Sequence, residues 1–234
     1  MSRQSILLDV LQRAHDAELA FTASLRPAER AVAGTLDRPA PKDLLAHNTA
    51  WKERLALRIV GESSALVTEV DVENAAIFAA HQDESLDAIL AYARRVHAQL
   101  LAAMQTLSEQ DLNDPELFAW TDERPLWRQI AGTACLHPLA HLGDYYSRRG
   151  ESERAIAMYE TAAEKLAPLD DDPTWRGLLA YNLACLYALS GNKESALTGL
   201  AEALRLNPEL TLWSQQDPDF TSLHDEPAYQ ALYA

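Results

Sequence analysis

The stretch LWRQIAGTACLHPLAHLGDYYSRRG, residues 126–150, decides how this chain is expected to fold. Its apolar residues recur at helical spacing, so we predict a helix from about 124 to 149 that ends at Gly150. His137 and His141 are four residues apart, which places them one turn apart on the same helix face. Pro138 lies between them, removes a backbone hydrogen bond and predicts a kink.

Three more long helices are predicted before this one. The ranges 5–24, 42–60 and 85–107 each carry apolar residues close to a 3.6-residue period. Strand signals are nearly absent from the chain. Four long helices that can run antiparallel favour an all-α fold, with a four-helix bundle over residues 1–150.

The segment between the second and third of these long helices is less regular. We expect a loop over 61–70 and a short helix over 71–81. Within it, LVTEVDV (66–72) is ambiguous between strand and helix.

The remainder of the chain repeats itself with an offset of 41 residues. This offset aligns Ala155 with Ala196 and Gly150 with Gly191. Small, aromatic and turn residues at these positions resemble the tetratricopeptide (TPR) pattern, and the extra length relative to the usual repeat fits the loop around LDDDPT. We therefore predict TPR-like repeats with a C-terminal capping helix over 137–234, fused to the bundle and sharing the helix around 125–149 with it.

A helical wheel tests whether one helix can serve both parts. With about 100° per residue, Leu139, Leu142 and Tyr146 fall on one face, and Ala134 and the two histidines fall nearly opposite. The wheel predicts a rigid junction without a flexible linker. Accidental similarity of Gly143 and Tyr146 to the repeat pattern is the alternative.

Two segments resemble the DinB/YfiT superfamily. DLLAHNTAWKERL (43–55) is similar to the family's leucine–leucine–x–histidine segment with a following tryptophan. The second is PLWRQIAGTACLHPLAHLGDYY (125–146), where the family places two ligands four residues apart; its LW-x-x-IAG run is similar to the ClbS/DfsB branch. The resemblance covers roughly residues 1–150, and it implies a metal held by His47, His137 and His141.

Imidazole chemistry agrees with that implication. Three imidazoles suit zinc or nickel first, with iron as a further option, and they leave positions open for water or substrate. The alternative is that a histidine pair at this spacing arises by chance or serves packing. The other histidines match no ligand position and are expected at the surface or in packing; they are His15, His81, His97 and His224.

The resemblance implies a metal-dependent transferase or hydrolase, in which the metal lowers the pKa of a thiol or water that attacks a small electrophile. A low-molecular-weight thiol is the expected small-molecule substrate. Asp144, one turn after His141, is a weak catalytic candidate, since a solvated acid is the simpler reading. Trp51, Trp120 and Trp127 are candidates for a pocket, with core packing as the default.

A non-catalytic adaptor is the alternative function, with the TPR surface bound to a protein partner or forming a homodimer. The formal net charge of −15 argues against nucleic acid as a partner. The sequence contains no apolar run long enough to cross a membrane and no signal-peptide pattern, so we expect a cytoplasmic protein. Cys135 and Cys185 lack basic sequence neighbours and are expected to be buried, reduced thiols.

Overall fold

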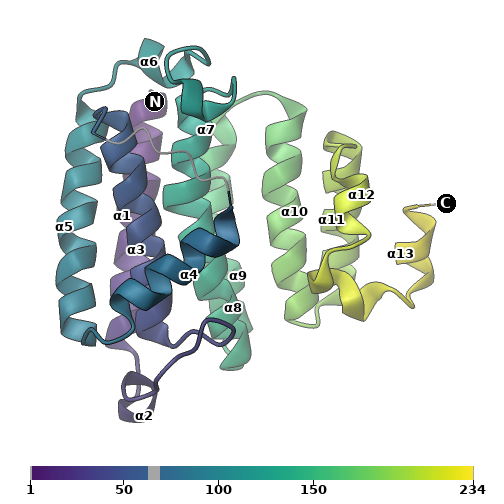
Figure 1. Ribbon diagram of the computed structural model, residues 1–234. Coiled ribbons are helices and arrows are strands. Elements are labelled where there is room, and N and C mark those ends of the chain that lie inside the picture. Colours follow the sequence, from purple (N-terminus) through teal and green to yellow (C-terminus); the bar gives the residue numbers. More distant parts are fainter. Residues whose placement is uncertain (1, 63–68, 234) are drawn as a thin grey trace. The chain divides into compact units, whose positions relative to one another are not determined.

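The computed structural model describes residues 2–62 and 69–233, and every regular element in these ranges is helical (Figure 1). An all-α fold is therefore confirmed. The chain divides into two compact units, Met1–Pro138 and Leu139–Ala234. The division falls within α8 (His137–Arg148), and each unit is described by itself below.

Long helices form the core of the N-terminal unit. They are α1 (Arg3–Ala23), α3 (Pro41–Ile59), α5 (Leu86–Gln105) and the run of α7 (Leu126–Ile130) with η2 (Ala131–Leu136). In Figure 1, α1, α3 and α5 lie side by side, and α1 and α3 both contact η2. The apolar stripes predicted from the sequence face inward, and their fully buried members include Leu7, Val10, Leu11, Ile89, Val96, Leu100, Leu126 and Ile130.

Side-chain caps explain where these helices begin. Ser85 precedes α5, and its hydroxyl oxygen accepts a hydrogen bond from the amide of Ala88 at 3.2 Å. Pro41 occupies the first position of α3, and the carboxylate of Asp43 accepts from the amide of Ala40 at 2.9 Å. Each contact satisfies an amide that the first helical turn leaves without a partner. The beginning of α3 matters most, because it fixes the position of His47 two turns into the helix.

Shorter elements surround these helices. They are α2 (Pro27–Arg30), α4 (Val70–His81), α6 (Glu109–Asn113) and the 3-10 turn η1 (Ala119–Thr121). Helix α4 packs against α3, and it confirms the short helix predicted for 71–81. Of the ambiguous stretch 66–72, the part from Val70 onward is helical, while residues 63–68 lie outside the described ranges.

The predicted continuous helix over 124–149 is corrected by the structure. It begins at Leu126, and between α7 and α8 the backbone forms a π-helix, Ala131–Leu136. The amide of His137 accordingly donates to the carbonyl of Gly132, five residues back. Pro138 supplies the physical reason, because its ring would press on the carbonyl of Ala134 in a regular α-helix and the wider turn relieves that crowding.

The C-terminal unit contains helices of repeating length and spacing. After α8 come α9 (Ser152–Leu166), α10 (Pro173–Leu189) and α11 (Lys193–Leu206). Helices α8 and α10 end 41 residues apart, and α9 and α11 begin 41 residues apart. The turns between paired helices contain Gly150 and Gly191 with φ of 75° and 80°, a conformation that glycine adopts without strain. The offset found in the sequence therefore corresponds to real helix boundaries.

The end of the chain adds short elements to this unit. They are η3 (Ala167–Leu169), α12 (Leu210–Ser214), η4 (Pro218–Leu223) and α13 (Pro227–Ala231). Phe220 and Tyr229 from these elements join the core of α10 and α11, which also contains Ala184, Ala196 and Leu200. The predicted capping segment is therefore packed onto the preceding helix pair. Its assignment to a TPR array stays a prediction.

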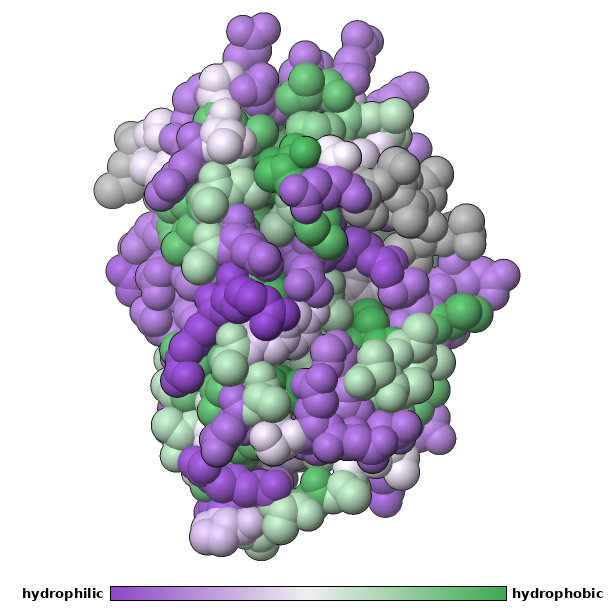
Figure 2. Space-filling view, turned by 60° about the vertical axis from the view of Figure 1, so that its left-hand side comes forward, coloured by the Kyte–Doolittle hydropathy of each residue, from purple (hydrophilic) through white to green (hydrophobic). Residues whose placement is uncertain are grey.

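The molecular surface and the cysteines complete the description. Hydrophilic side chains cover much of the face drawn in Figure 2 and enclose smaller apolar areas. Across the described residues, no helix combines the length and apolar character needed to cross a membrane. Both cysteines are buried and free, as predicted. Burial raises the pKa of the Cys135 thiol to about 12, and the charge of Lys52 opposes the rise.

Candidate metal centre

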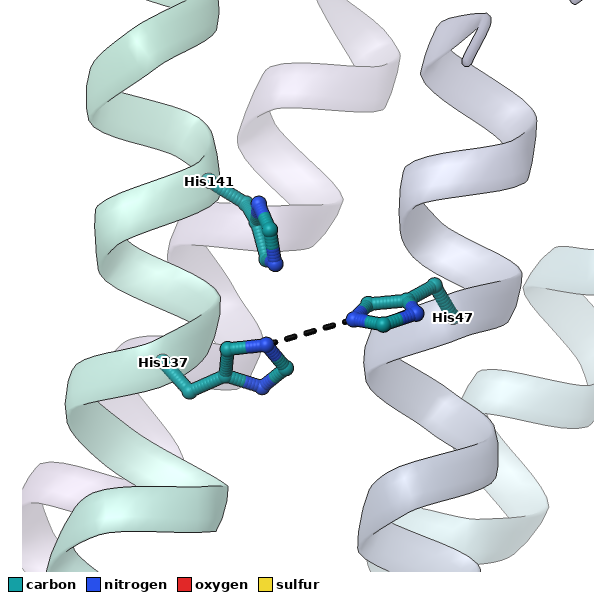
Figure 3. A group of neighbouring side chains, drawn as sticks. All are labelled: His47, His137 and His141. Atoms are coloured by element: carbon teal, nitrogen blue, oxygen red, sulfur yellow. Dashed lines mark hydrogen bonds between the residues drawn. The ribbon is translucent and has the colours of Figure 1, made fainter. Parts of the chain in front are cut away.

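Two helices bring the three predicted histidines together. His47 projects from α3, while His137 and His141 project from successive turns of α8 (Figure 3). All three side chains are half-buried. Although the boundary between units falls at Pro138, His141 follows His137 on the same continuous helix. Their ligand-type nitrogen atoms all lie within 4.8 Å of one another.

One contact in this group joins His47 and His137 directly. Their Nε2 atoms are 3.2 Å apart, and the two rings meet edge to face with centroids separated by 5.0 Å. In Figure 3 the ring of His141 also points toward the space between them. Two nitrogens bound to one zinc at about 2.0–2.1 Å in tetrahedral geometry are separated by about 3.4 Å. The observed spacing therefore fits two imidazoles that share an ion.

The donor set also fits a metal chemically. Neutral imidazole is the form that ligates a metal. Burial lowers the pKa of His141, and the charge of Arg148 lowers it further, so the ring is neutral at pH 7. Three nitrogens on one side of an ion leave other positions open, as catalytic metal sites require. The three histidines therefore form a group that could hold a divalent transition metal.

Asp144, the weak catalytic candidate, is half-buried one turn after His141 on α8. Burial raises the pKa of its carboxyl group, and Arg148 opposes the rise. The carboxylate also raises the pKa of Asp219, which belongs to the same unit. Its described electrostatic neighbours are thus Arg148 and Asp219, and its role at the histidines stays a prediction.

The three candidate tryptophans have different surroundings, and Trp120, in η1, has its ring centroid 5.5 Å from Cζ of Arg58. Trp127 is 1% exposed and belongs to the core, so the default interpretation holds for it. Trp51 is half-buried, and its ring centroid is 6.3 Å from that of His47. Its Nε1 donates to Asn74 on α4 at 3.1 Å, which fixes the indole beside the candidate centre. Trp51 is therefore placed to contact a molecule bound at the histidines.

A buried polar network that the sequence analysis missed lies beside His47 on α3. Lys52 donates from Nζ to Oε2 of Glu18 at 2.5 Å, and Asn48 donates to the other carboxylate oxygen at 3.1 Å. Glu18 is 1% and Lys52 is 4% exposed. His15 and His97 stack next to this pair with centroids 3.9 Å apart. The network ties α3 to α1 by directional bonds inside an otherwise apolar core.

A second group with metal-ligand chemistry lies in the C-terminal unit. Cys185, Asp217 and Asp219 bring a thiol and two carboxylates within 4.8 Å of one another. Asp217 accepts from the hydroxyl of Tyr181 at 2.6 Å and from the amide of Asp219 at 3.0 Å, where it caps η4. Burial, followed by Asp217 and Asp144, raises the pKa of Asp219 to about 6. Asp217 thus has a structural role that needs no ion.

Comparison with known proteins agrees with the helical fold and the histidine group. The model of the DinB superfamily matches residues 3–145, which include all three histidines. The chain therefore belongs to the DinB superfamily. No curated protein and no solved structure matches it.

Proposed function

We propose that the protein is a metal-dependent enzyme in which His47, His137 and His141 hold one divalent ion. Zinc or nickel suits the three imidazoles best, with iron as a further option. The observation that carries this proposal is the 3.2 Å separation of two Nε2 atoms from different helices, with His141 aimed at the same space. Membership of the DinB superfamily over residues 3–145 supports it.

The proposed reaction is transfer of a thiol to a small electrophile, or hydrolysis of that electrophile. A bound divalent ion lowers the pKa of a thiol or water, so that the nucleophile forms near neutral pH. In this scheme Trp51 bounds the space beside His47 and limits access of solvent to it. Asp144 is proposed to orient a ligand or accept a proton, given that burial raises its pKa toward the working range.

Metal analysis of the purified protein tests the proposal. We expect about one zinc, nickel or iron per chain, and loss of that metal in His47→Ala and His141→Ala. His224→Ala is the matched control, because His224 is exposed and its ring lies tilted against that of Tyr229, with centroids 5.2 Å apart, outside the group of three candidate ligands. A metal-free wild-type protein, or metal content unaffected by the two substitutions, would exclude the enzyme proposal. A metal-containing protein would next be tested with low-molecular-weight thiols and electrophiles.

A second proposal concerns the C-terminal unit. We infer that α8–α11 and the following short helices form a TPR-like array, fused to a DinB-type four-helix bundle, that contacts a protein partner or a second copy of the chain. The 41-residue correspondence of helix boundaries supports the repeat assignment. Binding of a partner that survives replacement of all three histidines would favour an adaptor role. Loss of activity without loss of partner binding in those variants would separate the two functions.

A further inference from the structure

The thiol and the two carboxylates of the C-terminal unit meet where α10 contacts η4. Cys185 belongs to α10, Asp217 caps the beginning of η4, and Asp219 lies in the first turn of η4. One ligand atom from each lies within 4.8 Å of those from the other two. Sγ of Cys185 is 3.9 Å from Oδ2 of Asp217. A thiolate and a carboxylate bound to one tetrahedral zinc are about 3.6 Å apart, so this spacing is close to that of two ligands.

The thiol is the member of this group that helix capping does not explain. Cys185 is 8% exposed and belongs to the apolar core that α10 and α11 share. Its sulfur nevertheless donates to the carboxylate of Asp217 and also interacts with that of Asp219. A buried cysteine normally behaves as a small apolar side chain, and carboxylates are costly neighbours in such a core. The convergence of this buried thiol with two carboxylates therefore indicates a set of metal ligands.

Negative charge is concentrated beside the thiol. Asp217 and Asp219 are both half-buried, and Asp144 on α8 also acts on Asp219. Among the described residues, the charges that shift the pKa of Asp219 are those of Asp217 and Asp144, and both raise it. Carboxylates held this close repel one another when they are ionised. A divalent cation beside them would offset that repulsion.

We propose that Cys185, Asp217 and Asp219 bind one divalent transition-metal ion that holds η4 against α10. Sulfur together with carboxylate oxygen suits zinc, whereas magnesium and calcium prefer oxygen alone. Asp217 keeps its bonds to the hydroxyl of Tyr181 and to the amide of Asp219, because each carboxylate oxygen has a second lone pair.

Metal binding at this site changes the state of the thiol. Burial and both aspartates raise the pKa of Cys185, so without an ion the sulfur keeps its proton. A bound cation outweighs these effects: an Sγ–metal bond forms and the thiol proton passes to solvent. The inference uses none of the three histidines and is independent of the proposed function.

Titration with Co²⁺ tests this inference in the full chain carrying His47→Ala and His141→Ala, because these substitutions remove two of the three histidine ligands. Cobalt bound to a thiolate gives a charge-transfer absorption in the near ultraviolet, and cobalt bound to imidazole does not. We expect one equivalent of Co²⁺ per chain with this absorption, and Zn²⁺ should displace it. Adding Cys185→Ser should abolish the absorption. Cys135→Ser is the matched control and should retain it, since Cys135 is also a buried free thiol but lies in η2.

Two further measurements cover the acidic ligands and the structural role. Asp219→Asn keeps the thiol but removes a carboxylate, and it should weaken Co²⁺ binding more than about tenfold. Removal of metal by EDTA should lower the Tm of the histidine double variant and leave that of its Cys185→Ser derivative unchanged.

The outcomes are distinct. Absence of the charge-transfer absorption at saturating Co²⁺, both in the double variant and in the wild type, would overturn the inference and leave hydrogen bonding as the only role of the thiol. Persistence of the absorption in Cys185→Ser would overturn it as well. An equal effect of EDTA with and without Cys185 would refute the proposed link between η4 and α10. None of these results depends on whether the histidines bind a metal.

Discussion

Replacing Lys52 with methionine should destabilise the protein strongly. The substitution keeps the length of the side chain but removes the ammonium group that donates to Glu18 at 2.5 Å. Glu18 is 1% exposed, so its carboxylate would remain buried without a counter-charge. Breaking a buried pair from one side costs about 3–5 kcal/mol. Asn48 still donates to the other oxygen, so we expect the lower end, about 3 kcal/mol.

Thermal unfolding followed by circular dichroism measures this effect. For a chain of this size, a loss of about 3 kcal/mol lowers the Tm by roughly 6–12 °C. The double variant Glu18→Gln/Lys52→Met removes both charges and should recover most of the loss. Lys193→Met breaks an ion pair of the same 2.5 Å length at the surface, where we expect less than about 1 kcal/mol. A Tm of Lys52→Met within about 2 °C of wild type, or no recovery in the double variant, would refute the reasoning.

Two further predictions concern acid stability and packing. Burial is the largest cause that lowers the pKa of His15 and of His97 to about 4, from 6.5 in the unfolded chain. Between pH 4 and 6.5 the unfolded chain therefore binds more protons at these two histidines than the folded chain does. Their contribution to the free energy of unfolding is complete above about pH 6.5 and is lost as the pH falls toward 4, by at most about 2.7 kcal/mol per pH unit for the pair. Urea unfolding across this range measures the loss, and His15→Gln/His97→Gln should flatten it; an equally steep profile in that variant would contradict the assignment. Gly177→Ala should cost about 1–3 kcal/mol, because its Cβ would lie 2.7 Å from Cβ of Asn207 and 3.1 Å from the carbonyl oxygen of Ala203. Gly132→Ala meets nothing within 4 Å and serves as the control in the same unfolding assay, with a neutral or stabilising effect expected; equal losses in both variants would show that the contact is not the cause.

Helix positions could be predicted from the sequence because helical periodicity is a local property. The ranges expected for α1, α3, α4 and α5 agree with the structure to within a few residues. The contact between His47 and His137 could not be predicted in this way, because 90 residues separate them and helical periodicity does not show which helices pack together. Only the family resemblance related them to each other.

Other features escaped prediction for identifiable physical reasons. Lys52 and Glu18 are charged residues, which sequence patterns assign to the surface. Both are buried because each neutralises the charge of the other, and a contact between two distant helices cannot be derived from the sequence pattern. The helical wheel assumed a constant rotation per residue, whereas the π-helix turns more slowly before His137. The wheel therefore places Ala134, which lies within the π-helix, at an inaccurate angle relative to Leu142.

The π-helix at Ala131–Leu136 makes chain length, as well as side-chain identity, a determinant of the candidate centre. A π turn contains about one residue more than the α turn it replaces. Deleting one residue from this segment would restore a regular helix and leave the flanking faces nearly unchanged, whereas adding a further residue would rotate everything after it by about 100° relative to α7. After such an insertion His137 and His141 would keep their mutual spacing but turn away from His47. A further insertion here, more than most substitutions, should therefore distinguish related chains that retain the histidine group from those that have lost it.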